Sequence, residues 1–368
     1  MRILIAPDKF KGSLTAAQAA QAIEDGFREA MPEAVFDRAL LADGGEGTAD
    51  VFSSWQGAEV RAAECLDALG RRVRGEYVWI PGERLAIIDL SSASGLSKIT
   101  EKDRDILLST TFGTGQIIVE ALKMGPETIA IGLGGSATTD GGAGMAAALG
   151  WIFQDSKERN VDPAPENLSK IATILPPPQP ITAKIIALCD VRNPLLGARG
   201  CSRVYAPQKG ATPEDVAILE SQLESFADVC EKTFGVSHRS APGSGAAGGA
   251  GFGLLTFFGA QIVGGFDWIA ARLGLDARVA ACDLVITGEG SIDSQTLEGK
   301  GPGSLAGLAR KHGKPCIAFS GRLENGAGEI FSRCFAISDP AMELAENLAC
   351  GAQLLRLASI KAAQSLRS

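Results

Sequence analysis

Residues 1–30 read MRILIAPDKFKGSLTAAQAAQAIEDGFREA, a short apolar run followed by a polar loop and a longer amphipathic stretch. The run at 3–6 has the composition of a buried strand, and residues 16–30 show the apolar spacing of a helix. A similar strand-helix-strand order returns near the other end of the chain, from 283 to 337. Because alternating strands and helices are typical of parallel sheets, we predict that both chain ends build one parallel-sheet domain.

The middle of the chain is less regular. Residues 59–90 read as consecutive strands joined by turns at 69–70 and 81–82, which predicts antiparallel pairing. The glycine-rich residues 245–253 predict a tight loop that leads into a buried helix at 254–269. Other expected strands lie at 85–90, 128–132, 184–188, 284–287, 316–320 and 334–337, with helices at 115–123, 213–233, 304–311 and 341–368.

The length of 368 residues favours two domains. We predict an α/β fold in which residues 1–60 and 275–368 form a discontinuous, Rossmann-like parallel-sheet domain. Residues 61–274 would form an inserted mixed α/β domain, with the active site in the cleft between the two.

Composition excludes several classes of function. A net charge of -8 without a Lys/Arg run disfavours nucleic acid and anionic membranes as partners, which leaves small molecules. The N-terminal residues lack the long apolar stretch of a signal peptide, so we expect a cytoplasmic location. The eight cysteines are scattered and the two histidines are far apart, which argues against a zinc site or a Ser-His-Asp hydrolase. Nothing in the sequence decides the oligomeric state.

Polar loops that directly follow predicted strands are the candidates for chemistry, because strand ends face the ligand crevice of an open parallel sheet. In the first loop, Lys9, Lys11 and the N–H groups at a helix start could hold a phosphate or carboxylate. Asp8 could orient a lysine or a metal-bound water there. The simpler interpretation is that Ser13 or Thr15 only caps the following helix.

Two further loops combine glycine with polar groups. Asp43 and Glu46 lie among three glycines and could accept a hydroxyl proton or a hydrogen bond, although composition alone favours a plain Asp-Gly-Gly turn. The stretch from 132 to 144 predicts a nest of N–H donors for a polyanion, with close packing of a glycine-rich helix as the alternative. Its candidate ligand-binding residues are Gly134, Gly135, Ser136 and Thr138.

Carboxylates also follow two later strands. Asp190 could serve as a base or metal ligand, with Arg192 or Lys209 as countercharge, unless these residues form only a surface ion pair.

Near the end of the chain, Glu289 and Asp293 offer hard oxygen ligands suited to Mg²⁺, and Lys300 offers charge for a phosphate. Solvated turn carboxylates are the alternative.

Taken in order, these loops resemble the bacterial glycerate kinase type 1 family over essentially the whole chain. The resemblance implies an ATP- and Mg²⁺-dependent kinase that converts glycerate to 2-phosphoglycerate, with 3-phosphoglycerate as the alternative product. The motifs are APDKFKGSL (6–14), ADGGEGT (42–48), GGSAT and DGGAG (134–138 and 140–144), PQKGA (207–211), GSGAAGG (243–249) and ITGEG (286–290).

With that resemblance, we expect the loop at 134–138, with Lys11 or Lys300, to bind phosphate and Asp190 to accept the glycerate hydroxyl proton. The loop at 8–13 would bind the glycerate carboxylate. Two other functions stay open. A hydroxy-acid oxidoreductase using NAD(P) is disfavoured because the G-x-G-x-x-G match at 243–248 does not follow a strand. The other is a metabolite sensor without turnover.

Overall fold

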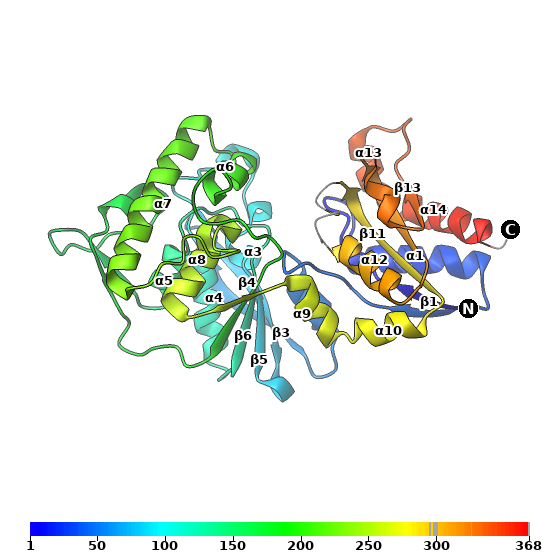
Figure 1. Cartoon of the computed structure of the whole chain (residues 1–368), viewed down its shortest axis with the longest axis horizontal. Coiled ribbons are helices and arrows are strands. Elements are labelled where there is room, and N and C mark those ends of the chain that lie inside the picture. Colours follow the sequence, from blue (N-terminus) through cyan, green and yellow to red (C-terminus); the bar gives the residue numbers. More distant parts are fainter. Residues whose placement is uncertain (294–295, 297–300, 325, 367–368) are drawn as a thin grey trace. The chain divides into compact units, whose positions relative to one another are not determined.

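The computed structural model describes residues 1–293, 296, 301–324 and 326–366, which form two compact units (Figure 1). The terminal unit comprises Met1–Asp43 and Phe266–Ser368, and the inserted unit comprises Gly44–Gly265. The predicted α/β class is confirmed. Both ends of the chain build one parallel sheet, and the segment between them forms a mixed α/β unit. The units divide at 43/44 and 265/266, compared with the 60/61 and 274/275 read from the sequence.

The terminal unit is built on a five-stranded, all-parallel sheet of order β13-β12-β11-β1-β2. Its central strands, β1 and β11, come from opposite ends of the chain and pair with Leu4 opposite Val285. The expected strand at the N-terminus and the three near the C-terminus are therefore confirmed. The strands are β1 (Arg2–Ile5), β2 (Val35–Arg38), β11 (Leu284–Ile292), β12 (Cys316–Leu323) and β13 (Arg333–Ala336).

Helices cover both faces of this sheet because its strands are apolar on both sides. Ile3 and Ile5 pack with α1 and α14 on one face, whereas Leu4 and Ala6 pack with α10 and α12 on the other. Thr15 caps α1 by accepting the N–H of Gln18. The helices are α1 (Ala16–Ala30), α9 (Gly265–Arg272), α10 (Leu275–Ala281), α12 (Gly301–Lys311), α13 (Leu344–Ala349) and α14 (Gly351–Ser365), with the 3₁₀ helix η6 (Ala327–Ile330).

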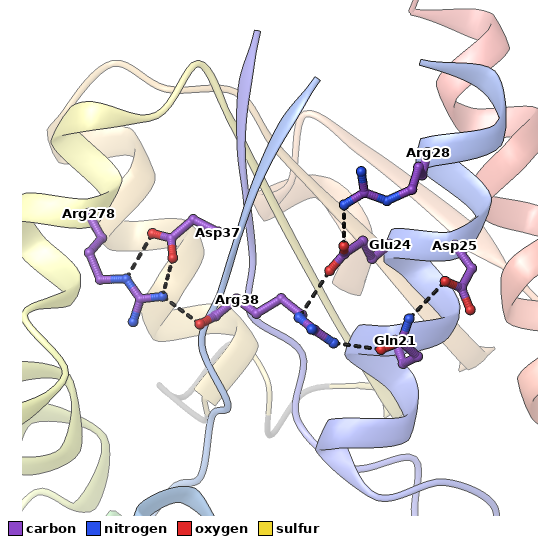
Figure 2. A network of polar contacts seen from close by, with 7 residues as sticks. All are labelled: Gln21, Glu24, Asp25, Arg28, Asp37, Arg38 and Arg278. Atoms are coloured by element: carbon purple, nitrogen blue, oxygen red, sulfur yellow. Dashed lines mark hydrogen bonds and ion pairs between the residues drawn. The ribbon is translucent and has the colours of Figure 1, made fainter. Parts of the chain in front are cut away.

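The edge strand β2 is tied to helices on both sides of the sheet (Figure 2). Asp37 binds Arg278 of α10 through two hydrogen bonds of 2.7 and 3.0 Å. Its neighbour Arg38 contacts Glu24 of α1 at 3.0 Å. Successive side chains of a strand point to opposite faces, so the two ion pairs hold β2 from both sides. Each partly exposed pair contributes about 0–1 kcal/mol.

The inserted unit contains a six-stranded mixed sheet of order β10-β9-β6-β5-β4-β3. The pairs β3/β4 and β4/β5 are antiparallel, as the turns had predicted, and β5, β6, β9 and β10 are parallel neighbours. A separate pair, β7 (Ile152–Gln154) and β8 (Thr173–Leu175), is antiparallel. The sheet strands are β3 (Glu59–Leu66), β4 (Arg72–Ile80), β5 (Leu85–Asp89), β6 (Thr128–Gly132), β9 (Lys184–Leu188) and β10 (Gln261–Val263).

The larger apolar clusters of the inserted unit lie between the sheet and α4, α5 and α8, and around α7. Phe226 and Phe257 stack in the second cluster with ring centroids 6.1 Å apart. The helices are α2 (Thr48–Ser53), α3 (Ser91–Ser94), α4 (Phe112–Leu122), α5 (Ala143–Ala148), α6 (Cys201–Tyr205), α7 (Pro213–Phe234) and α8 (Ala246–Phe258), with 3₁₀ helices η1 (Pro81–Glu83), η2 (Leu96–Lys98), η3 (Glu101–Asp103), η4 (Pro165–Lys170) and η5 (Pro207–Lys209).

Two helix predictions were wrong in extent. The helix expected at 254–269 is interrupted, because Gly259 has φ +59° and ends α8 before β10 pairs with β9 and α9 begins. The C-terminal helix is divided into α13 and α14 around Cys350. Within the described ranges, no helix is long and apolar enough to cross a membrane.

Candidate active site

Three carboxylates come together at the carboxyl edge of the sheet in the terminal unit. Asp8 follows β1, Asp43 follows β2, and Glu289 lies near the end of β11, and these three strands are neighbours in the sheet. The N–H of Asp8 donates to the carbonyl oxygen of Gly288 at 2.9 Å, which holds the loop against β11. The sequence had selected all three residues separately, and the parallel topology brings them to one edge.

The carboxyl group of Asp8 has an unusual proton affinity. Burial first, and then the negative charges of Asp43 and Glu289, raise its pKa to about 7. The backbone N–H of Lys9 donates to Asp8 Oδ1 at 2.6 Å and acts in the opposite direction. Asp8 therefore gains or loses a proton near neutral pH, which is typical of groups that work in proton transfer or beside a cation.

The loop from Lys9 to Ser13 packs closely on β11, where Gly290 allows the approach. A Cβ atom on Gly290 would lie 3.0 Å from the backbone nitrogen of Lys11. Lys11 is exposed and Lys9 is half-buried. The Ser13 hydroxyl donates to the carbonyl oxygen of Leu348 at 2.6 Å, so Ser13 anchors the C-terminal segment and does not cap α1. No local pattern predicts this contact, because the two residues are 335 positions apart.

The two predicted metal ligands lie around Thr296. Its hydroxyl donates to Glu289 Oε1 at 2.8 Å, and the N–H of Asp293 donates to Thr296 Oγ1 at 3.3 Å. In the part of the chain that the structure describes, no three His, Cys, Asp or Glu side chains are grouped to hold a metal ion. Lys300 lies outside the described residues. Because Mg²⁺ is often held by one or two carboxylates plus waters and phosphates, the pair remains compatible with it.

In the inserted unit, the loop at 44–47 lies against the ends of β5, β6 and β9. A Cβ atom on Gly134 would lie only 2.4 Å from the Cα of Gly45, so the two glycine loops are in direct backbone contact. Asp89, at the end of β5, accepts the N–H groups of Gly47 at 2.8 Å and Ala49 at 3.1 Å. It thereby caps the short helix α2.

A hollow of about 310 Å³ opens beside this loop. Glu46 lies in its wall and accepts a hydrogen bond of 3.2 Å from Ser97. Ser91, Lys98 and Asp89 also line it, and sequence reasoning missed all three. Ser91 directly follows the strand predicted at 85–90, so the rule that identified the other loops would have found Ser91 as well, whereas Asp89 lies inside that predicted strand.

In the predicted polyanion loop, backbone groups are accessible to a ligand and the side-chain hydroxyl groups are buried. Gly134 is half-buried and Gly135 is exposed, with φ +74° at Gly135. Among the described residues, no protein acceptor is recorded for their N–H groups. Ser136 and Thr138 are buried and their hydroxyl oxygens contact each other at 2.8 Å. The loop can therefore bind an anion through the N–H groups of its two glycines.

Behind the loop, Asp140 and Lys209 are buried charges. Asp140 is fully buried, and this burial raises the pKa of its carboxyl group. Its two oxygens accept five hydrogen bonds from N–H and hydroxyl groups of neighbouring residues. Lys209 Nζ donates to the carbonyl oxygen of Thr138 at 2.6 Å, and burial lowers the Lys209 pKa to about 8. The ionisable groups that act on Lys209 are Asp140 and Cys201, so Lys209 is no countercharge for Asp190.

The remaining predicted residues follow β9. Asp190 Oδ1 accepts the N–H of Gly265 at 2.7 Å, and Arg192 is exposed. The G-x-G-x-x-G match at 243–248 follows a turn and not a strand. Gly248 is used in packing, since a Cβ atom there would lie 1.9 Å from the carbonyl oxygen of Thr138. In the structure, this motif therefore packs against the predicted polyanion loop and supports it.

Known proteins match this chain along almost its whole length. The model of the family described as "Glycerate kinase family" aligns with residues 3–367. A glycerate 2-kinase from Escherichia coli (strain K12) is 41% identical over 334 residues, which span 90% of this chain and 87% of that protein. A glycerate kinase from Halalkalibacterium halodurans is 39% identical over 97% of this chain and 96% of its own length.

A solved structure agrees with these matches. The crystal structure of a protein from Salmonella typhimurium LT2, provisionally named glycerate kinase 2, superposes with a TM-score of 0.84. It is 38% identical and covers 100% of this chain and 98% of that chain. The family match, the related sequences and the similar solved structure confirm the resemblance that the sequence motifs indicated. The chain belongs to the glycerate kinase family.

Proposed function

We propose that the protein is an ATP- and Mg²⁺-dependent kinase that phosphorylates the 2-hydroxyl of glycerate. The observation that carries this proposal is the family match over residues 3–367, together with the name glycerate 2-kinase of the Escherichia coli relative. A kinase of this kind works where ATP is supplied, which is consistent with the expected cytoplasmic location. No observation favours an oxidoreductase or a sensor.

The phosphate chain of ATP is assigned to the loop at Gly134 and Gly135. Their N–H groups have no recorded protein acceptor within the described chain, and the positive φ of Gly135 is typical of an anion-binding nest. Phosphoryl transfer needs charge neutralisation and alignment more than a strong nucleophile, so fixed N–H donors suit it. The neighbouring hollow with Glu46 and Ser97 offers acceptors and donors for hydroxyl groups.

Glu289 and Asp293 are the proposed Mg²⁺ ligands, and bound Mg²⁺ would neutralise phosphate charge. The hydrogen bond from Thr296 orients one oxygen of Glu289. Asp8 and Asp43 add negative charge at the same sheet edge, and Asp8 is the proposed residue that orients a lysine of this loop, because the charge of Lys9 acts on its carboxyl group. Asp190 is the proposed acceptor of the glycerate hydroxyl proton.

Lys11 is the proposed partner of the glycerate carboxylate. Replacing it by alanine should raise the KM for glycerate by about 10-fold or more, while the KM for ATP changes little, because a charge-assisted bond to the substrate is lost. Steady-state kinetics with each substrate varied in turn measures both constants. Lys361, exposed on α14 of the same unit, provides the matched control variant Lys361→Ala. An unchanged glycerate KM in Lys11→Ala would move the carboxylate pocket elsewhere.

Gly134 should not tolerate a side chain. The Cβ of a Gly134→Ala variant would meet the backbone of Gly45 at 2.4 Å, so one of the two loops must shift. We expect a KM for ATP raised by about 10-fold or more, since misplacing a positioned group by about 1 Å costs about 10²-fold. Gly307, where a Cβ would meet nothing within 4 Å, is the matched control. Normal ATP kinetics in a folded Gly134→Ala protein would contradict the assignment.

The proposal is tested by ³¹P NMR of the purified protein with MgATP and D-glycerate. A 2-phosphoglycerate resonance that grows with ADP supports it, and a 3-phosphoglycerate resonance keeps the kinase but changes the attacked hydroxyl. Unchanged ATP in the presence of folded protein would remove glycerate as the acceptor.

A further inference from the structure

A buried lysine lies behind the glycine loop that is assigned to phosphate. Lys209 is 4% exposed, and its ammonium donates to the carbonyl oxygen of Thr138 at 2.6 Å. Lysine is almost never buried to this degree without a compensating group. Its side chain is enclosed by protein, so it does not reach a ligand on the exposed side of Gly135.

The groups that face Lys209 explain how its charge is tolerated. They are the carboxyl group of Asp140 and the thiol of Cys201. Burial raises the pKa of Cys201 to about 12, so the thiol is neutral near pH 7. Asp140 accepts hydrogen bonds from N–H and hydroxyl donors, a set that fits a carboxylate anion. The Lys209 ammonium and the Asp140 carboxylate thus fix the segment 138–144 through buried hydrogen bonds.

The same loop carries the N–H groups of Gly134 and Gly135, which precede Thr138 by four and three residues. We infer that Lys209 is a positioning residue, which fixes the carbonyl of Thr138 and places a positive charge behind these anion-binding N–H groups. In a buried, weakly screened environment, that charge acts over several ångströms and favours a bound polyanion. The inference rests on the proposed function only for the identity of that polyanion, the phosphate chain of a nucleotide.

This role makes phosphate binding depend on pH. Burial lowers the pKa of Lys209 to about 8, so the ammonium is present below that pH and is lost above it. Neither facing group changes this sign, because Asp140 favours the charged form of Lys209 and the thiol of Cys201 is neutral in this pH range. The affinity for a polyphosphate should therefore fall as the pH rises through about 8, in addition to any effect of exposed groups.

The test is calorimetric binding of ADP and of inorganic tripolyphosphate, without glycerate, on both sides of pH 8. Lys209→Met should bind both ligands about 10- to 100-fold more weakly near pH 7, the range that loss of a supporting partner costs at metal sites. It should also lose the decrease in affinity at higher pH. Lys209→Arg should recover part of the affinity and lack that decrease, because a guanidinium keeps its proton.

Controls separate this role from simple stabilisation. Cys201→Ala changes the same buried surroundings without removing a charge, so it should lower Tm and leave polyphosphate affinity unchanged. A lysine with only a structural role would lower Tm in Lys209→Met without altering the pH dependence. Wild-type affinity, or wild-type pH dependence, in a folded Lys209→Met protein would overturn the inference.

The same measurements distinguish the inference from the proposed function. If polyphosphate binds as expected but ³¹P NMR detects no phosphorylated glycerate, the function fails and the inference stands. If glycerate is phosphorylated while Lys209→Met binds polyphosphate like the wild type, the function stands and the inference fails.

Discussion

Asparagine at position 190 is expected to lower kcat for glycerate phosphorylation by about 10²- to 10⁴-fold, the usual range for loss of a general base. An amide does not accept the hydroxyl proton that we assign to Asp190. The asparagine oxygen can still accept the N–H of Gly265, now bonded at 2.7 Å, so the local fold should be retained. Coupled assays of ADP formation measure the effect, and the glycerate KM should change much less than kcat.

Asp162 supplies the matched control for this substitution. It is an exposed aspartate of the same unit, and Asp162→Asn should keep wild-type kinetics. Should Asp190→Asn retain wild-type turnover, another group must take the proton. Asp8, whose pKa of about 7 suits a general base, would then be the next candidate.

Asparagine at position 8 is expected to lower kcat/KM by about 10²-fold and to remove an acidic limb from its pH profile. Asp8 is protonated below a pKa of about 7, and the neutral carboxyl group no longer supports a cation or accepts a proton. Wild-type kcat/KM, which reports groups of the free enzyme, should therefore fall as the pH decreases below about 7. A wild-type profile that is flat through this range would contradict the role.

The same substitution should stabilise the protein at higher pH. The pKa of Asp8 is raised from 3.8 to about 7, so between these values the folded state binds more protons than the unfolded state. Stability from this group is therefore largest at low pH, falls as the pH rises through this window, and stays reduced above it. Thermal unfolding of Asp8→Asn should show a higher Tm at pH 8 and little gain near pH 4. Asp25 is an exposed aspartate on α1, and Asp25→Asn is the control variant for these Tm measurements.

Local pattern was sufficient for most of the fold. The apolar run in β1, the helical spacing of α1 and the turns between β3, β4 and β5 depend on residues close in sequence, and each was predicted correctly. The break at Gly259 was missed because apolar residues continue on both sides of it. Only pairing of β10 with a distant strand decides that the chain extends there.

The candidate site shows the same division. Local sequence was enough to predict which loops are candidates for the chemistry, because glycines and carboxylates directly after strands form a local pattern, and the motifs identified the family. Three features could be seen only in the folded chain: Asp43 and Glu289 raise the pKa of Asp8, Ser13 binds Leu348, and Lys209 is buried against Thr138. Burial and electrostatic interaction depend on distance in space, and strand order sets that distance between residues far apart in the chain.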